Sequence, residues 1–478
     1  MESSNTYEST ETANLDAPRF IASRSIRRTS SAGSSWRRHS LSFRHQGSSE
    51  FYADDDTEDE VVSQAGDIGD RELNIYKRSE SGGLRSSIDS LRSIEILPVP
   101  EESQWQSPVS PLPAETISPL STDAILNLKN ENPGPPSTQP YKDTVKRLPM
   151  SFEYLSCLIH LAVFGILGVI TRYLLQKLFG PSVSHVTSDH SALYLDLPSN
   201  VVGSFLMGWL GVVFKGDICS VSDLLAIALT TGYLGSLTTF SGWNQKMLDL
   251  SVEGQWVTAA VGIFLGMAIA HWSIWLGVET AEGLKWYLER RSSGSESGSS
   301  TSKKKFRVDS MKRHLAVIIV LVLMLVLLWG FSGALLKYRL DDEDTSASLW
   351  LACIVGPPGV WVRWFLARLN GKGLGKKGSF KWIPFGTLAA NVLAAALMAA
   401  LSTVKKAVDT KKCDIIITGI QLGTLGCLST VSTFIAEFHA MCSSKHPLRA
   451  FTYAAITIIP SFILGTLIYS VPVWVKGY

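Results

Sequence analysis

Nine apolar segments follow one another along residues 151–478, and each is close to the roughly 20 residues that a helix needs to cross a bilayer. They are expected at about 152–179, 193–214, 222–244, 256–278, 314–336, 349–369, 382–404, 413–438 and 450–475. Residues 1–150 are rich in Ser, Pro, Arg and Glu and carry no sustained apolar run. Such a stretch cannot bury enough apolar surface to offset the entropy of ordering. The sequence therefore predicts an all-α polytopic membrane protein behind a disordered tail.

Lysine and arginine orient the segments, because short loops rich in these residues stay on the cytosolic side. The connection 281–313 carries nine of them and 370–381 carries four. The first thirty residues lack the apolar core of a signal peptide, which also favours a cytosolic start. Nine crossings then place the N-terminus inside and the C-terminus outside, although one loop disagrees. That loop carries Lys405, Lys406, Lys411 and Lys412.

The membrane part contains an internal repeat at a shift of 191 residues. "GYLGSLTTFSGW" (232–243) matches "GTLGCLSTVSTF" (423–434) at six of twelve positions, whereas about one in sixteen is expected from average residue usage. Further matched pairs are Arg172 with Arg363, Gly180 with Gly371, and Asn200 with Asn391. No gap is needed from the first segment of each unit to the third, which indicates duplication.

The repeat divides the chain into four-helix units at 151–280 and 349–478. Between them, 281–348 holds a flexible linker and the lone segment 314–336. A single crossing between two four-crossing units makes the second unit start from the opposite face, so we predict inverted repeats related by an axis in the membrane plane. Such folds often bind an ion or substrate at mid-membrane, where broken helices expose backbone groups.

The third segment of each unit contains closely spaced glycines. Gly232 and Gly235, and likewise Gly423 and Gly426, can interrupt a helix and free carbonyls that lipid cannot satisfy. Two such breaks meeting on the pseudo-axis can hold one cation by backbone carbonyls, and the hydroxyls after each break can line a polar track. Close packing of small residues between helices is the alternative explanation.

Four motifs resemble those of the Fluc (CrcB) fluoride channels. "GSLTTFSGW" (235–243) and "CLSTVSTF" (427–434) are similar to the third-helix signature, "PFGTLAANVLAAALM" (384–398) to the second-helix pattern, and "GVITRYLL" (168–175) to the first. The resemblance covers nearly all of 152–475 apart from the linking helix. A fused, inverted pair with one linking helix is similar to the eukaryotic fluoride exporters (FEX).

This resemblance implies passive fluoride conduction, a structural sodium ion and two potential pores. It implies sodium ligands at the backbone carbonyls of Gly235, Thr238, Gly426 and Ser429. It implies pore-facing amides at Asn200 and Asn391, and arginines near a vestibule at Arg172 and Arg363. The hydroxyls expected along the pore belong to Thr239, Ser241, Thr430, Ser432 and Ser461.

The resemblance also implies that each pore pairs a phenylalanine of one unit with one of the other. Phe240 and Phe434 are both present, whereas the second pair is Val431 with Trp243. The positive edge of a phenylalanine ring can meet a small anion without a full charge that would trap it. We therefore predict one conducting pore at Phe240 and Phe434 and one degenerate pore at Val431 and Trp243.

The resulting hypothesis is a passive fluoride channel of the plasma membrane that acts as a monomer, exports fluoride and confers fluoride resistance. We expect no enzymatic activity and no nucleic-acid partner. One alternative is a proton-coupled fluoride transporter, which usually needs an intramembrane acid; Glu437 and Asp196 are predicted near segment ends. A non-transporting membrane scaffold is the other alternative.

Overall fold

The computed structural model describes residues 65–66, 150–293, 311–374 and 379–477. Apart from one isolated bridge between Leu374 and Ser379, this part of the chain consists of helices and the turns that join them. The all-α fold predicted from the sequence is therefore confirmed. Most of the predicted disordered tail, and the flexible linker after residue 293, lie outside the described residues.

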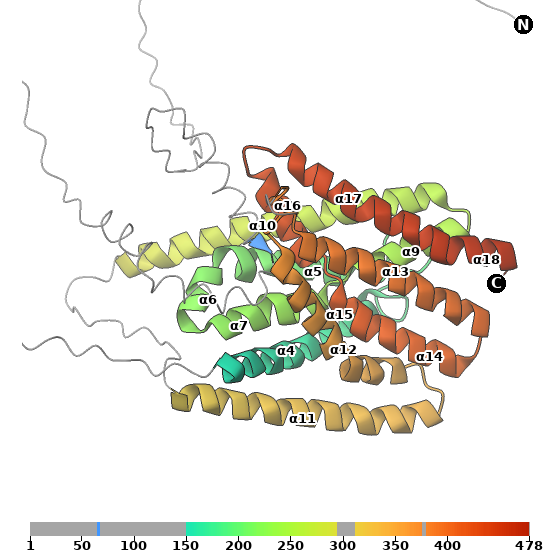
Figure 1. The fold of residues 1–478 in the computed structure, drawn as a ribbon, viewed down its shortest axis with the longest axis horizontal. Helices are drawn as coiled ribbons and strands as arrows, with labels where there is room; N and C mark the ends of the chain where they lie inside the picture. The colour runs from blue at the N-terminus through green and yellow to red at the C-terminus, as the bar shows by residue number, and fades with distance from the viewer. Residues whose placement is uncertain (1–64, 67–149, 294–310, 375–378, 478) are drawn as a thin grey trace, which may run out of the picture. The chain divides into compact units, whose positions relative to one another are not determined.

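Along the chain, the helices form two sets joined by a lone helix, which runs along the lower edge of the bundle in Figure 1. The first set is α4 (Met150–Phe179), α5 (Leu197–Met207) with η2 (Gly208–Val213), α6 (Lys215–Val221), α7 (Asp223–Ile227), η3 (Ala228–Leu234), α8 (Gly235–Leu237), α9 (Phe240–Val252) and α10 (Trp256–Ser293). The lone helix is α11 (Met311–Asp341). The second set is α12 (Ala347–Leu366) with η4 (Ala367–Leu369), α13 (Phe385–Val408), α14 (Lys411–Ile420), η5 (Gln421–Leu425), α15 (Gly426–Leu428), α16 (Ser432–Cys442), α17 (Leu448–Gly465), η6 (Thr466–Ser470) and α18 (Val471–Lys476).

Eight helical stretches in the described part are long and apolar enough to cross a membrane. A ninth is added if Leu197–Val213 and Lys215–Val221, which are bent by 65° relative to each other, form one span. These stretches coincide with the nine predicted segments. The fourth extends further than predicted, because α10 continues as a polar helix to Ser293 after its apolar run.

The linking helix α11 is the most apolar span, with a mean hydropathy of 2.9. Its sequence carries no polar residue between Leu315 and Phe331 apart from the indole of Trp329, yet one of its faces is packed. Ile318, Leu321 and Ser332 are buried, and the ring of Phe331 meets Trp350 of α12 edge-on with centroids 5.4 Å apart. Because only 17% of its apolar stretch is buried inside the protein, α11 keeps more contact with lipid than the other spans.

The two sets run in opposite directions. In Figure 1, α11 starts beside the beginning of α4 and ends beside the beginning of α12, so these first helices cross the bundle in opposite senses. Close approaches repeat at the 191-residue shift: a side-chain carbon at Gly168 would collide with the Tyr233 carbonyl, and one at Gly359 with the Thr424 carbonyl. Only glycine permits a helix to pack that tightly on another backbone.

Candidate functional site

Both third helices are broken at the centre of the bundle. In the first repeat the chain leaves α8 at Thr238 and Thr239, whose backbones are extended (φ −99°, ψ 151° and φ −143°, ψ 127°), before α9 begins. In the second repeat Ser429 is extended after α15 (φ −87°, ψ 157°). Hydroxyl residues, three positions after the glycines, therefore form the actual breaks.

The glycines before each break have a different role from the one that we predicted. Gly235 and Gly426 both keep helical angles (φ −67°, ψ −25°), so neither interrupts its helix. A side-chain carbon at Gly235 would collide with the guanidinium of Arg363, and one at Gly426 with that of Arg172. Each glycine thus makes room for an arginine of the opposite repeat.

Arg172 and Arg363 are buried, with 1% and 2% of their surface exposed. The Arg172 Nη1 donates to the carbonyl of Gly426 at 3.0 Å, and its Nη2 donates to Leu422. The Arg363 Nη2 donates to the Thr231 carbonyl at 2.6 Å. Their placement inside the bundle differs from the vestibule that we expected, because the broken helices offer carbonyls that a buried guanidinium needs.

The two second-helix asparagines hold the breaks in place. Asn200 accepts from the Thr239 amide at 2.9 Å and donates to the Thr239 carbonyl at 3.2 Å. Asn391 does the same at Thr430, at 2.8 Å and 3.1 Å. In an unbroken helix the Thr239 and Thr430 amides would bond the carbonyls of Gly235 and Gly426, so the asparagines release those two carbonyls.

The hydroxyls of the two breaks meet across the repeats. Thr238 Oγ1 lies 3.0 Å from Ser432 Oγ, and Ser429 Oγ lies 2.8 Å from Ser241 Oγ. The hydroxyls of Thr238 and Ser429 also accept hydrogen bonds from backbone amides of the opposite repeat. The Ser432 N–H donates to Thr238, and the Ser241 N–H donates to Ser429, both at 3.0 Å. Such exchanged contacts are typical of a two-fold axis.

Phe240 and Phe434, from opposite repeats, are in contact. Their ring centroids are 6.1 Å apart at 63°, and Phe434 lies 5.2 Å from Tyr453 of α17. Tyr453, Thr457 and Ser461 follow one another at four-residue spacing and are fully buried. α17 packs on α13, which carries Asn391, and on α9. We call the set formed by Phe240, Asn391, Phe434, Tyr453, Thr457 and Ser461 the α17 cluster.

A buried carboxylate closes one end of this cluster and was missed by the sequence reasoning, which placed Glu437 near a segment end. Its side chain is 1% exposed; it accepts from the Tyr453 hydroxyl and from Thr387 Oγ1, both at 2.7 Å. Gly66 is also buried beside it, since a side-chain carbon there would collide with the carboxylate. The one signal for it in the sequence is the series Tyr453, Thr457 and Ser461, whose four-residue spacing places polar side chains on one face of α17.

The second potential pore has a counterpart set on α10. Trp243 donates its indole N–H to the Gly262 carbonyl at 3.2 Å and stacks on Tyr194, with centroids 6.2 Å apart at 10°. Val431 belongs to the same buried core. α10 packs on α5 and α16, and it presents Ile263 and Met267 to this core. We call the set formed by Tyr194, Asn200, Trp243, Ile263, Met267 and Val431 the α10 cluster.

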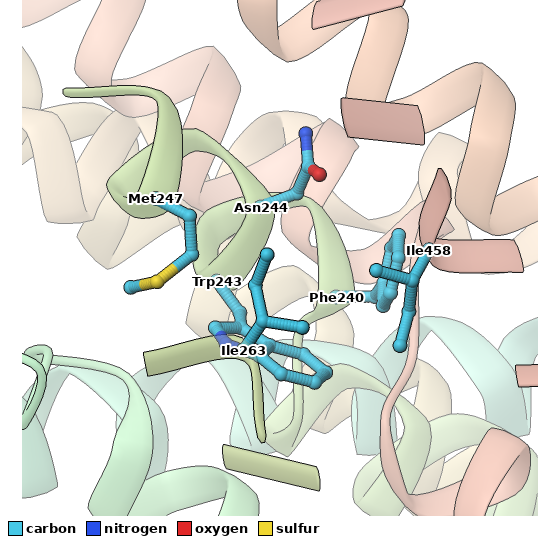
Figure 2. Close-up of a pocket in the computed structure, with 6 residues that line it drawn as sticks. All are labelled: Phe240, Trp243, Asn244, Met247, Ile263 and Ile458. Atoms are coloured by element: carbon cyan, nitrogen blue, oxygen red, sulfur yellow. The ribbon is translucent and has the colours of Figure 1, made fainter. Parts of the chain in front are cut away.

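A small cavity lies where the two clusters meet (Figure 2). It is lined by Phe240, Trp243, Asn244, Met247, Ile263 and Ile458. Its volume of about 10 Å³ is at the lower limit for one water molecule. Asn244 is its one amide side chain, and its Nδ2 lies 3.4 Å from the Ser461 carbonyl. A dehydrated ion of water size is therefore the largest species that this space accommodates without side-chain movement.

Comparison with known proteins finds the same duplication. The family described as "CrcB-like protein, Camphor Resistance (CrcB)" matches residues 159–278 and again 350–468, and the two matches start 191 residues apart (350 minus 159). Together they cover half of the chain. No solved structure matches the chain.

Bacterial relatives are similar to this chain over nearly their whole length. The protein named fluoride-specific ion channel FluC from Geobacter metallireducens is 35% identical over 127 residues, which are 27% of this chain and 98% of the relative. The FluC proteins of Shewanella sp. (strain ANA-3) and Geotalea uraniireducens are 34% and 31% identical, and 91% and 100% of their lengths are covered. One repeat of this chain therefore corresponds in size to one bacterial chain.

Proposed function

This chain belongs to the CrcB family, whose domain it carries twice, and from that premise we propose that it is a passive fluoride channel of the eukaryotic fluoride exporter (FEX) type. The relatives named as fluoride-specific ion channels support the substrate. The observation that carries the proposal is the contact of Phe240 with Phe434, with centroids 6.1 Å apart, inside a cluster that combines ring edges, an amide and hydroxyls. The α17 cluster is the conducting pore in this proposal.

The chemistry of the α17 cluster suits a small, strongly hydrated anion. Fluoride is a strong hydrogen-bond acceptor, and amide N–H and hydroxyl groups are donors that can replace its water. Aromatic edges add a weak positive potential. Conduction requires binding that is strong enough for the ion to come in and weak enough for it to leave. Neutral donors and ring edges meet this condition better than a buried guanidinium, and both arginines are engaged by backbone carbonyls.

We place the channel in the plasma membrane, with the N-terminus cytosolic and the C-terminus extracellular. Hydrogen fluoride crosses membranes as a neutral molecule and dissociates in a near-neutral cytosol. An inside-negative membrane potential then drives the anion out through a passive pore. Cells gain fluoride resistance in this way without nucleotide hydrolysis. A fused pair of repeats holds both halves of the pore, so the monomer is the functional unit.

A structural sodium ion at the breaks also belongs to the proposal. The carbonyls of Gly235 and Gly426 lose their helical amide partners to Asn200 and Asn391, so these oxygens fit a monovalent cation. Gly426 shares its carbonyl with Arg172. When bound, the ion would supply positive charge that holds the carbonyl ends of the two broken helices together, along with the carbonyls of Thr238 and Ser429.

Proton-coupled fluoride transport is the second candidate, because Glu437 is a buried carboxylate bonded to Tyr453. Intramembrane acids of this kind often carry protons in transporters. The two candidates differ in what drives the flux. A channel responds only to the fluoride gradient and the voltage, whereas a coupled transporter also responds to a proton gradient at fixed voltage.

The experiment is fluoride efflux from liposomes that contain the purified full-length protein, followed with a fluoride electrode. We expect voltage-driven efflux of fluoride and none of chloride. Asn391→Leu should reduce it at least tenfold, and Asn200→Leu, the matched change in the α10 cluster, should reduce it less. Protein-containing liposomes that release no more fluoride than empty ones would refute the channel.

A further inference from the structure

The two asparagines that hold the breaks differ in one contact. Each amide nitrogen carries two N–H donors, and each asparagine uses one of them on the carbonyl of its break. Asn200 Nδ2 has a second acceptor, the Tyr194 hydroxyl, at 3.1 Å. For Asn391 Nδ2, the described residues provide no second acceptor, although Asn391 is fully buried.

The sequence explains why only one repeat has this contact. Tyr194 is fixed by its place six residues before Asn200, and the residue six positions before Asn391 is Phe385. Phenylalanine has the same ring without the hydroxyl, so the second repeat has no acceptor at this place. The 191-residue shift relates the two positions directly.

Tyr194 is held rigidly where it is. It is 1% exposed, and its ring stacks on Trp243 at 10°. Trp243 is itself anchored by the bond from its indole to Gly262 at 3.2 Å. A side-chain carbon at Gly266 would lie 2.8 Å from the Trp243 ring, so α10 makes room for the indole at that glycine.

A buried amide donor needs an acceptor. In the α17 cluster the described residues supply no acceptor for the second N–H of Asn391, and fluoride is the acceptor that the proposed function provides. In the α10 cluster the tyrosine oxygen already fills that role. We propose that the Tyr194 hydroxyl is an internal ligand of Asn200 that takes the place of fluoride and closes the α10 cluster to the ion. This inference rests on the proposed function.

Tyr194 is therefore a specificity-determining residue. Because its hydroxyl occupies the second N–H of Asn200, Asn391 is the asparagine whose N–H binds fluoride. The loss of the phenylalanine at Val431 and the bulk of Trp243 also disfavour conduction there, so restoring the rings alone should not open the α10 cluster. For fluoride to enter the α10 cluster, the second N–H of Asn200 must also be released from the Tyr194 hydroxyl.

The test uses full-length protein in liposomes with Phe434→Ile, which disables the α17 cluster. On this background, Val431→Phe with Trp243→Phe restores the rings and keeps Tyr194, and a third variant adds Tyr194→Phe. We expect the ring-restored variant to stay at the background and the variant with Tyr194→Phe to raise fluoride efflux at least tenfold. Equal efflux from the two, whether high or at the background, would overturn the inference.

The same substitutions with Phe434 intact show whether the variants fold, because the α17 cluster should then conduct. A wild type that releases no fluoride would refute the proposed function and the inference together, whereas a conducting wild type with no effect of Tyr194→Phe refutes only the inference.

A second measurement needs only one hydroxyl to be removed. Tyr194→Phe leaves the Asn200 donor buried without its partner, so sodium fluoride should raise the melting temperature of this variant more than that of the wild type, and sodium chloride should not. Tyr233→Phe, which removes a hydroxyl 3.3 Å from Thr171, is the matched control. An identical fluoride effect on all three proteins would contradict the role of Tyr194.

Discussion

The hydroxyl of Thr238 lies 3.0 Å from that of Ser432 and accepts the Ser432 amide at the same distance. This pair joins the broken helix of one repeat to the broken helix of the other at the centre of the bundle. Thr238→Val keeps the shape of the side chain and removes these bonds, so the buried amides of Ser432 and Val431 lose this acceptor. We expect a loss of about 1–3 kcal/mol in the free energy of unfolding, measured by thermal unfolding in detergent.

The control for Thr238 is Thr452→Val, because Thr452 lies on the exposed side of α17 and its hydroxyl donates to the Leu448 carbonyl of its own helix. We expect a change within about 0.5 kcal/mol there. Similar losses at the two positions would show that the contact between the breaks does not stabilise the pairing of the repeats.

Arg172→Met tests whether the buried arginines hold the repeats together. The guanidinium bonds two carbonyls of the opposite repeat, and hydrogen bonds to a charged group are worth roughly 1.5–3 kcal/mol each. We expect little folded protein, seen as loss of the monodisperse peak in size-exclusion chromatography. Arg339→Met removes a partly exposed pair with Asp344 and should cost less than about 1 kcal/mol. Normal yields of Arg172→Met would contradict the role of the arginine.

Gly359→Ala tests the close approach of α12 to η5. The added methyl group would collide with the Thr424 carbonyl, and backbone cannot move away as a side chain can, so we expect a loss of about 1–3 kcal/mol. Gly330→Ala on α11 is the matched change, with no atom within 4 Å, and should be neutral or stabilising by up to about 1 kcal/mol. Thermal unfolding measures the stability of both variants. Equal changes in stability for Gly359→Ala and Gly330→Ala would contradict the tight packing of α12 on η5.

Glu437→Gln separates the two transport mechanisms. The glutamine oxygen can accept from Thr387 and its amide can donate to the Tyr453 oxygen, so the contacts with these two residues have substitutes. For a channel we expect at least a third of the wild-type fluoride efflux, independent of a proton gradient at fixed voltage. Glu437→Leu, which leaves both partners without an acceptor, should lose more. Proton-dependent flux in the wild type that Glu437→Gln abolishes would favour coupled transport.

Apolar segments and the 191-residue repeat sufficed to predict the all-α fold and the two helix sets, because both depend on patterns that persist over many residues. The function of Gly235 was harder to predict, because the sequence alone does not distinguish a glycine that breaks a helix from one that leaves space for a neighbouring side chain. Here the neighbouring side chain is the Arg363 guanidinium of the other repeat. Contacts between distant residues, such as that of Arg172 with Gly426 and that of Tyr194 with Trp243, depend on packing that no local pattern encodes. The Glu437 site was missed because the burial of a carboxylate within α16 depends on the neighbouring helix α17, which supplies Tyr453.

We propose that fluoride passes between Phe240 and Phe434 and not between Val431 and Trp243. Fluoride efflux from liposomes measures it most directly, with Phe240→Ile and Phe434→Ile compared with Trp243→Ile. We predict that either phenylalanine change reduces efflux at least tenfold, while Trp243→Ile leaves it within about twofold of the wild type. Intact efflux in both phenylalanine variants together with its loss in Trp243→Ile would contradict the assignment.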